Sequence, residues 1–351
     1  MPSFNKILII RFSSLGDILL ITPLLRAVRS RFPSARIDVL VKQTYGDLLR
    51  FHPAVGTLLE LPPGGRRELG AMIRRVRGER YDLVLDLHNS LRSIAVRLLS
   101  GCRRRGVVSK HAVARWILVR WKKNYYRRII PVAERYLRAA ERFGVQGDDR
   151  GLEIYLPGEV TSSVRVRLEK YRLDKYETVI GFAPTARHFT KRWPQARFVE
   201  AGILLASAGR VKILVFGGKD ETEYCADVVH LINSAVNAPA AENCALDFTL
   251  METAAVLDRC DAVLTNDSGL MHLAAARKRK IVALFGSTVA EFGFFPYGTK
   301  AVVLEKKPLS CRPCTPIGRD ECPLGHFSCM NDIQARDVVA ALKSLLPVPK
   351  K

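Results

Sequence analysis

Acidic residues are scarce in this chain. It has 34 Asp and Glu against 56 Lys and Arg, a formal net charge of +22 over 351 residues. Such a surplus favours anionic partners, namely nucleic acid, phosphorylated small molecules or an anionic membrane surface. The remaining composition, 48% hydrophobic and 26% charged, is that of a globular protein and excludes a largely disordered chain.

Long apolar runs are also missing. A membrane-spanning helix needs about 18 uninterrupted apolar residues, and the best candidate, residues 18–28, is broken by Thr22, Pro23 and Arg26. A signal peptide fits poorly, because Asp17 adjoins that run and no small-residue cleavage site follows it. We therefore expect a cytoplasmic protein.

Short apolar runs alternate with helical patterns along most of the chain. The expected strands are residues 6–11, 36–41, 57–61 and 81–86, then 178–183, 212–216, 262–265 and 281–285. Pro23 is expected to begin or kink the helix after the first strand. Strands that alternate with helices predict βαβ units and parallel sheets. The expected fold class is α/β, with two doubly wound Rossmann-like domains.

The pattern also suggests where the domains begin and end. We expect a first domain at 1–155 with a basic segment at 101–142, a linker region at 156–176 and a second domain at 177–332. The amphipathic stretch 333–351 is expected to form a helix that packs back on the first domain.

Ligands of doubly wound sheets bind beyond the carboxyl ends of the strands, so the loops that follow strands are the candidate sites. The first strand is followed by Arg11-Phe-Ser-Ser-Leu-Gly-Asp17. Gly16 permits a tight loop or close approach by a ligand. Asp17, at a helix start, either stabilises the helix N-terminus or acts as a general base.

Three further loops follow strands of the second domain. In Asp267-Ser-Gly-Leu-Met-His272 the first two residues are good N-caps, and the helix N-terminus can bind a phosphate; a capped helix with a packed histidine is the alternative. Arg187, Lys191 and Arg192 could hold a pyrophosphate. The carboxylates of Gly217-Gly-Lys-Asp-Glu221 could bind ribose hydroxyls.

Together these motifs resemble glycosyltransferase family 9, the ADP-heptose:lipopolysaccharide heptosyltransferases. The resemblance runs from Lys6 to about Val339. Its carriers are Arg11 to Asp17 with Thr22-Pro23, Lys191-Arg-Trp-Pro194, Gly217-Gly218 and Asp267-Ser-Gly-Leu-Met-His-Leu-Ala274. The cysteine group near the C-terminus is most similar to the heptosyltransferase II branch.

The resemblance implies a GT-B fold, in which two such domains face a central cleft. It implies an acceptor in the first domain, an ADP-sugar in the second, and inverting transfer of L-glycero-D-manno-heptose to the lipopolysaccharide inner core. Asp17 matches the family's base, with Arg11, Ser13, Ser14 and Gly16 expected on the acceptor side. The implied donor-binding residues are Thr185, Arg187, Lys191, Glu221, Asp267, Ser268, Gly269 and His272.

Such a transfer is one in-line displacement and needs one base, not the close carboxylate pair of a retaining hydrolase. Lys191 and the helix N-terminus would stabilise the leaving diphosphate, so we expect no catalytic metal and no cofactor. A GT-B transferase with another nucleotide-sugar donor remains an alternative. A Rossmann oxidoreductase is disfavoured, because Gly-x-Gly-x-x-Gly does not follow the first strand.

Two features leave alternatives open. Cys311, Cys314, Cys322 and Cys329 have spacings compatible with a structural zinc or iron–sulfur cluster, with reduced thiols, or with disulfides. The basic segment with its Trp and Tyr residues suits single-stranded nucleic acid, an ordinary solvated helix, or a phosphorylated glycolipid acceptor (Kdo-lipid A or a heptosylated core) in an anionic bilayer. Because no nucleic-acid motif accompanies it, we expect peripheral attachment to the inner membrane and no nucleic-acid partner.

Overall fold

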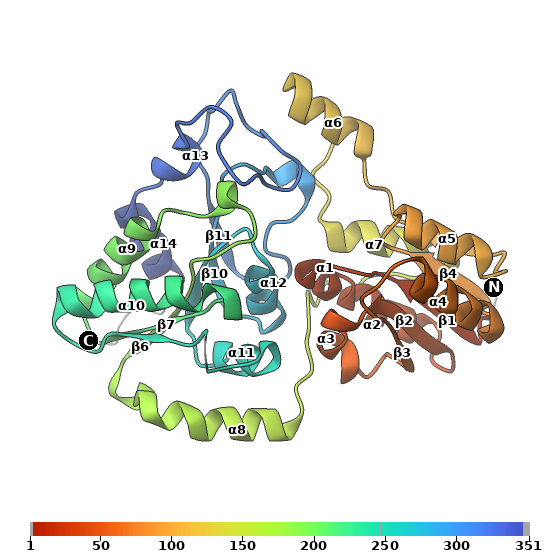
Figure 1. The fold of residues 1–351 in the computed structure, drawn as a ribbon, viewed down its shortest axis with the longest axis horizontal. Helices are drawn as coiled ribbons and strands as arrows, with labels where there is room; N and C mark the ends of the chain where they lie inside the picture. Colours follow the sequence, from red (N-terminus) through yellow and green to blue (C-terminus); the bar gives the residue numbers. More distant parts are fainter. Residues whose placement is uncertain (1–2, 246, 347–351) are drawn as a thin grey trace. The chain divides into compact units, whose positions relative to one another are not determined.

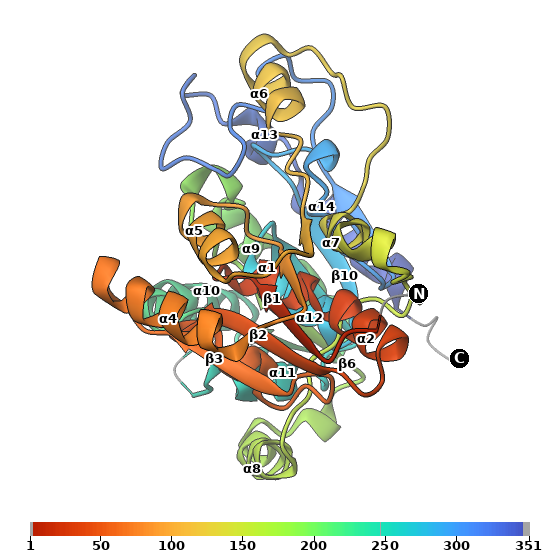
Figure 2. The same ribbon diagram turned by 90° about the vertical axis from the view of Figure 1, so that its right-hand side faces the viewer.

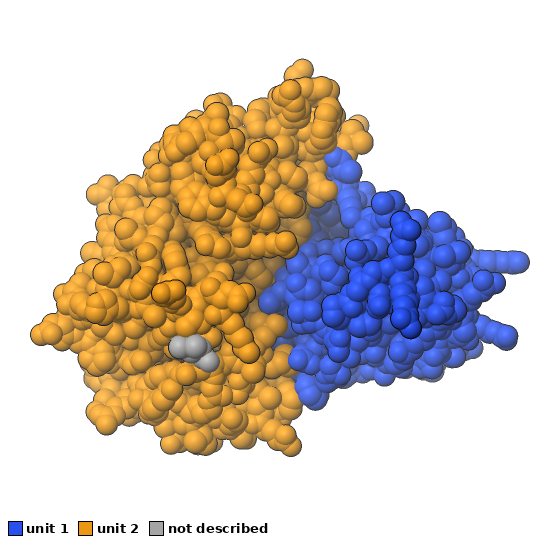
Figure 3. Space-filling view, in the orientation of Figure 1, with its two compact units in different colours: residues 1–112, 130–155 blue, residues 113–129, 156–351 orange. Residues whose placement is uncertain are grey.

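The computed structural model describes residues 3–245 and 247–346. It divides into two compact units (Figure 3). The first consists of the chain up to Ala112 together with Ile130–Tyr155, and the second of Val113–Ile129 together with the chain from Leu156 onwards. Each unit has its own parallel sheet with helices between the strands (Figure 1).

The sheet of the first unit has the strand order β3-β2-β1-β4-β5. These strands are β1 (Lys6–Ile10), β2 (Arg36–Lys42), β3 (Thr57–Leu61), β4 (Leu83–Asp86) and β5 (Arg105–Val107). All neighbours run parallel, and Ile7 of β1 pairs with Ile37 on one side and Leu83 on the other. The sequence predicted the first four of these strands, and β5 lies at the sheet edge.

Pro23 divides the helical stretch after β1, as expected. The chain forms α1 (Leu15–Leu20) and α2 (Thr22–Arg31), with Pro23 in the first turn of α2, where a missing N–H costs no hydrogen bond. Figure 2 shows α2 and α7 (Val132–Ala140) on one face of the sheet and α4 (Arg66–Glu79) and α5 (Leu91–Leu99) on the other. The short helix α3 (Asp47–Arg50) precedes β3.

The sheet of the second unit has the strand order β11-β10-β9-β6-β7-β8. Its strands are β6 (Thr178–Ala183), β7 (Val211–Val215), β8 (Ala241–Asn243), β9 (Ala262–Asn266), β10 (Lys280–Leu284) and β11 (Ala301–Leu304). The strand order reverses between β6 and β9, as it does between β1 and β4 in the first unit. Both orders are those of doubly wound nucleotide-binding sheets, which confirms the predicted fold class.

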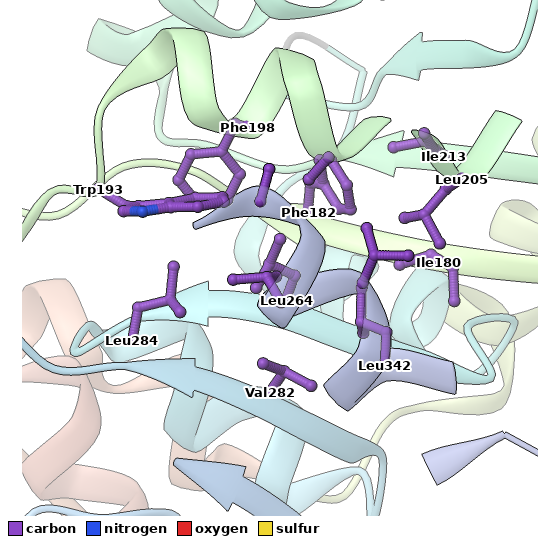
Figure 4. Close-up of a cluster of buried hydrophobic side chains, with 14 of the residues drawn as sticks. Ile180, Phe182, Trp193, Phe198, Leu205, Ile213, Leu264, Val282, Leu284 and Leu342 are labelled. Atoms are coloured by element: carbon purple, nitrogen blue, oxygen red, sulfur yellow. The ribbon is translucent and has the colours of Figure 1, made fainter. Parts of the chain in front are cut away.

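Helices cover both faces of the second sheet. α9 (Gln195–Ser207), α10 (Thr222–Val236) and α14 (Ala335–Leu345) pack on one face, where they enclose an apolar core (Figure 4). α12 (Gly269–Ala276) contacts β9 and β10, and α11 (Leu250–Leu257) contacts α12. The core includes Trp193 and Phe198, whose rings meet edge to face with centroids 5.0 Å apart.

Three stretches differ from the sequence prediction. α14 was expected with the first unit but belongs to the second, because Val338, Leu342 and Leu345 form an apolar stripe buried in the second unit's core. The expected linker 156–176 contains α8 (Gly158–Leu168), which packs on α11 and has few buried apolar residues to signal it. The basic segment is divided, because Val113–Ile129, with most of α6 (Ala112–Trp121), belongs to the second unit.

In the part of the chain that the structure describes, no helix is both long enough and apolar enough to cross a bilayer.

Candidate active site

Asp17 lies beyond the carboxyl end of β1, as the third residue of α1. Its Oδ1 forms an ion pair with Arg11 Nη2 at 2.6 Å and accepts a hydrogen bond from Tyr136 Oη at 3.2 Å. Its Oδ2 accepts from the backbone N–H of Ser14 at 3.2 Å and from the Ser14 hydroxyl at 3.1 Å. The side chain is 14% exposed. This carboxylate is therefore fixed in position but still reachable.

The surroundings of Asp17 keep it ionised. Burial by itself would raise the pKa of this carboxyl, but the Arg11 guanidinium and the Ser14 N–H outweigh burial and lower the pKa below its usual value. Burial and the nearby Asp17 raise the pKa of the Tyr136 phenol, so the phenol stays protonated and donates. The group is thus a carboxylate near neutral pH.

The other residues predicted on the acceptor side differ in their contact with Asp17 and in their exposure. Arg11 forms an ion pair with the carboxylate and also donates a hydrogen bond from Nη1 to the Leu87 carbonyl at 2.6 Å. Ser14 is exposed at the N-cap of α1, Ser13 is half-buried and Gly16 is buried inside the first turn.

Two residues near this site were missed from the sequence. Tyr136 comes from α7, far along the chain, and its only signal is its place on the apolar face of that helix. His88 follows β4, and its ring lies 5.1 Å from Phe12 between centroids. Burial, then Arg11 and Lys110, lower the pKa of His88 to about 4, so its imidazole is neutral near pH 7. The strand-end rule that found Asp17 could have found His88.

In the second unit, Lys191 and Asp267 are paired. Lys191 Nζ lies 2.7 Å from Asp267 Oδ2, and the two side chains are 16% and 6% exposed. The same oxygen accepts a hydrogen bond from Thr288 Oγ1 at 2.8 Å. Thr288, which the sequence analysis missed, follows β10 and so lies at the same sheet edge. The loops after β6, β9 and β10 therefore converge on one charge pair.

Thr185 and Glu221 form a second pair at that edge. Thr185 Oγ1 donates to Glu221 Oε2 at 2.7 Å, and the same carboxylate oxygen accepts from the Gly218 N–H at 2.8 Å. Thr185 follows β6 and is 4% exposed. The loops after β6 and β7 thus place a hydroxyl beside a carboxylate, a combination that can bind a sugar hydroxyl.

The start of α12 differs in detail from the prediction. Ser268 occupies the N-cap, but its side chain makes no capping hydrogen bond and lies 3.4 Å from Thr265 Oγ1. The first-turn N–H groups from Gly269 onwards are therefore not capped by this hydroxyl, which suits binding of an anion. His272 lies one turn further, 3% exposed, with its ring 6.5 Å from that of Phe294.

The two arginines of the β6 loop have different surroundings. Arg187 is exposed, and Arg192 donates from Nε to the Ala186 carbonyl at 2.6 Å within its own loop. Asn266, which was not predicted as a site residue, connects the loops of this region by hydrogen bonds. Its amide donates to the Pro184 carbonyl at 2.8 Å and accepts from the Trp193 N–H at 3.0 Å, so it joins the loops after β6 and β9.

The four C-terminal cysteines line one cavity. All eight cysteines of the chain are free thiols, and Cys311, Cys314, Cys322 and Cys329 surround a cavity of about 10 Å³. Burial, together with the other three thiols, raises the pKa of Cys329 to about 12, against an opposing effect of Arg312. Among residues 3–245 and 247–346, no three His, Cys, Asp or Glu side chains are already arranged to hold a metal ion.

Comparisons with known proteins agree with this architecture. The family model described as glycosyltransferase family 9 (heptosyltransferase) matches residues 69–324. The chain is 29% identical over 354 residues to lipopolysaccharide heptosyltransferase 2 of Escherichia coli K12, covering 97% of this chain and 98% of that relative. It is 30% identical over 313 residues to lipooligosaccharide heptosyltransferase 2 of Haemophilus influenzae, covering 85% and 88%.

Solved structures are similar over the whole chain. The E. coli ADP-heptose lipopolysaccharide heptosyltransferase II superposes with a TM-score of 0.73 at 25% identity, covering 97% of this chain and 98% of that one. A family 9 glycosyltransferase from Veillonella parvula gives 0.79 at 23% identity, with 98% of both chains covered, a likeness of fold alone. The GT-B fold and the family resemblance are thereby confirmed: the chain belongs to glycosyltransferase family 9 and is a glycosyltransferase.

Proposed function

We propose that this enzyme transfers L-glycero-D-manno-heptose from ADP-heptose to the lipopolysaccharide inner core, with inversion. The observation that carries the proposal is the Asp17 carboxylate, buried but reachable and kept ionised beyond the end of β1. The substrates are supported by the names of the full-length relatives, which are heptosyltransferases of lipopolysaccharide and lipooligosaccharide.

In the proposed reaction an acceptor hydroxyl attacks the anomeric carbon of the donor. The new C–O bond forms as the bond from that carbon to the ADP phosphate oxygen breaks, which inverts the anomeric centre. Asp17 takes the proton of the attacking hydroxyl, and the bonding electrons leave with ADP. Arg11 and Tyr136 hold the carboxylate in place, so the base does not have to be oriented during the reaction.

The second unit would bind the leaving nucleotide. Lys191 and the uncapped first turn of α12 would face the diphosphate, where negative charge develops as the bond breaks. The Thr185–Glu221 pair would bind ribose hydroxyls, and Arg187, exposed on the same loop, would reach the donor on binding. Because these groups supply the positive charge, the proposed step requires no divalent metal ion.

The test is transfer from ADP-heptose to defined truncated cores, namely Kdo-lipid A and singly heptosylated cores. We expect Asp17→Asn to bind ADP normally but to transfer about 10²–10⁴-fold more slowly, the usual contribution of a general base. Asp47→Asn, at an exposed position on α3, is the matched control and should keep full activity. No transfer to any core would refute the proposed acceptor, and transfer only from another nucleotide sugar would refute the donor.

We also propose that the protein attaches to the anionic face of the inner membrane through α6 and the residues that follow it. This α6 surface carries exposed Trp116, Trp121 and Tyr125, which are 56%, 56% and 62% exposed. Their neighbours include Arg120, Lys123, Arg127 and Arg128, all exposed. Aromatic rings suit the headgroup region, and cations suit anionic lipids.

The cysteine group, we propose, serves as a structural metal centre and does not itself touch substrate. The convergence of four thiols on one small cavity supports this assignment. Metal analysis of protein purified without chelator tests it.

A further inference from the structure

The loop that carries the cysteines also contacts the segment that carries Lys191. We call residues 309–329 the cysteine loop; it ends in the short helix α13 (Ser328–Asn331). The segment in question is the 3-10 turn η5 (Phe189–Lys191), which lies between β6 and α9. Thr190, the residue before Lys191, lines the cysteine cavity.

Thr190 is fastened to the cysteine loop by its backbone and its side chain. Its N–H donates to the Arg319 carbonyl at 3.0 Å, and its Oγ1 accepts from the Arg319 N–H at 2.8 Å. One residue earlier, the ring of Phe189 stacks on Phe327 with centroids 4.9 Å apart. The position of η5, and with it the backbone of Lys191, therefore depends on the course of this loop.

The partner of Lys191 is tied to the same loop. Arg312 Nη2 donates to the Thr288 carbonyl at 2.7 Å, and the Thr288 hydroxyl donates to Asp267 at 2.8 Å. Arg312 is itself held by Glu305 at 2.8 Å and is 5% exposed. Both members of the Lys191–Asp267 pair are thus attached to the cysteine loop, one through Thr190 and the other through Thr288.

The surroundings of the four thiols suit an anionic metal centre. Arg312 lines the cavity together with the four thiols. Lys122 lies near Cys311 and Cys314, and its Nζ donates to the Pro313 carbonyl at 2.6 Å. A zinc ion with four thiolates carries net negative charge, which these cations would offset. All four thiols line a single small cavity of about 10 Å³, as the ligands of one ion would.

We propose that Cys311, Cys314, Cys322 and Cys329 bind one zinc ion that fixes the cysteine loop and thereby positions Lys191 for the donor diphosphate. This inference deepens the structural metal centre proposed above, and it rests on the proposed transfer reaction in naming that diphosphate. Each thiol loses its proton as it binds, and the four close around the ion as a tetrahedral structural site. The cysteines are positioning residues, because they act through Thr190 and Thr288 and do not touch substrate.

The first experiment measures metal content of the full chain purified with zinc in the medium and no chelator. We expect about one zinc per chain in the unaltered protein and in Cys260→Ala, which removes a buried thiol (1% exposed) outside the group. We expect loss of that zinc in the double variant Cys311→Ser/Cys314→Ser. Protein that binds no zinc, or that holds several irons with sulfide, overturns the proposal.

The second experiment measures ADP affinity by calorimetry in a double-mutant cycle. Loss of the zinc site should weaken ADP binding about tenfold, in the range for residues that orient binding groups. In a Lys191→Ala background the same loss should change affinity less than about twofold, because the affected contact is already gone. Equal weakening in both backgrounds would mean that the metal merely stabilises the fold, and the positioning role would be wrong.

Should the cysteine variants fold poorly, zinc is removed from the unaltered protein with a chelator and then restored. Recovery of ADP affinity on adding zinc supports the proposal, and unchanged affinity throughout overturns it. ADP binding is measured without any acceptor. A failure of this proposal therefore appears in metal content and ADP affinity, whereas a failure of the proposed function appears as ADP binding without heptose transfer.

Discussion

Asp17 has to remain a carboxylate while it is largely removed from water. Arg11 makes this possible, because a guanidinium keeps its charge at any physiological pH and lies 2.6 Å from the carboxylate. Tyr136 and Ser14 add hydrogen bonds from two further directions. The result is a base that its fixed neighbours keep ionised near neutral pH.

This arrangement predicts the acid limb of the pH–rate profile. Since the pKa of Asp17 is lowered, the rate of transfer should be independent of pH near neutrality, and the midpoint of its acid limb should lie below the ordinary carboxyl pKa of about 4. Arg11→Met removes the nearest positive charge, so the pKa of Asp17 should rise and the acid limb should move to higher pH. The measurement is kcat/KM against pH, with Arg50→Met as the control. Identical acid limbs in Arg11→Met and the unaltered protein would contradict this account.

Some site residues could be found from the sequence and others could not. Asp17, Thr185, Lys191, Glu221 and Asp267 each follow a predicted strand, and parallel strands bring such residues to one edge of their sheet. Two of the residues that support them, Tyr136 and Asn266, follow no such rule. Tyr136 contacts Asp17 from a helix far along the chain. Asn266 was not predicted, because its side chain hydrogen-bonds the backbone of a neighbouring loop.

Every central strand of the two sheets was predicted from the sequence, and of the edge strands only β3 was. β1 and β6 are continuous apolar runs with parallel neighbours on both sides. β5, β8 and β11 lie at sheet edges; the first two are three residues long and β11 is only half-buried. A short or half-buried edge strand needs fewer apolar residues, so its hydrophobic pattern is hard to distinguish from that of a loop.

The C-terminal helix α14 belongs to the core of the second unit, and a core deletion there should be costly. Leu342 is fully buried, so Leu342→Ala should lower the free energy of unfolding by about 2–5 kcal/mol. Leu204→Ala, on α9 but 41% exposed, should change it by less than about 0.5 kcal/mol. Urea unfolding followed by circular dichroism measures both. Equal effects would mean that α14 does not contribute to this core.

At the scale of the molecule, the net charge of +22 comes from basic residues with different roles. Lys191 is paired within the candidate donor site, and several arginines are paired on the surface. The α6 surface differs from these, because its cations lie among exposed aromatic rings. The composition predicted an anionic partner, but only the structure separates charges that hold the fold from those directed at solvent.

Membrane attachment predicts different behaviour for two sets of cations. Changing Arg120, Lys123 and Arg127 to Gln should weaken binding to phosphatidylglycerol vesicles on the order of 10²-fold, from about 1 kcal/mol for each charge. The charge-matched control changes Arg74, Arg75 and Arg77 of α4, which are exposed without aromatic neighbours, and should have little effect. Vesicle sedimentation at two salt concentrations measures binding. If both sets weaken it alike, only net charge matters.

The place of α14 in the second core has a consequence for protein synthesis. The first unit needs nothing beyond Tyr155, whereas the second lacks part of its core until Leu345 has been made. At about 5–20 residues per second, the ribosome takes roughly 10–40 s to cover that interval. The half that carries Asp17 can therefore fold while the half that carries Lys191 is still being translated.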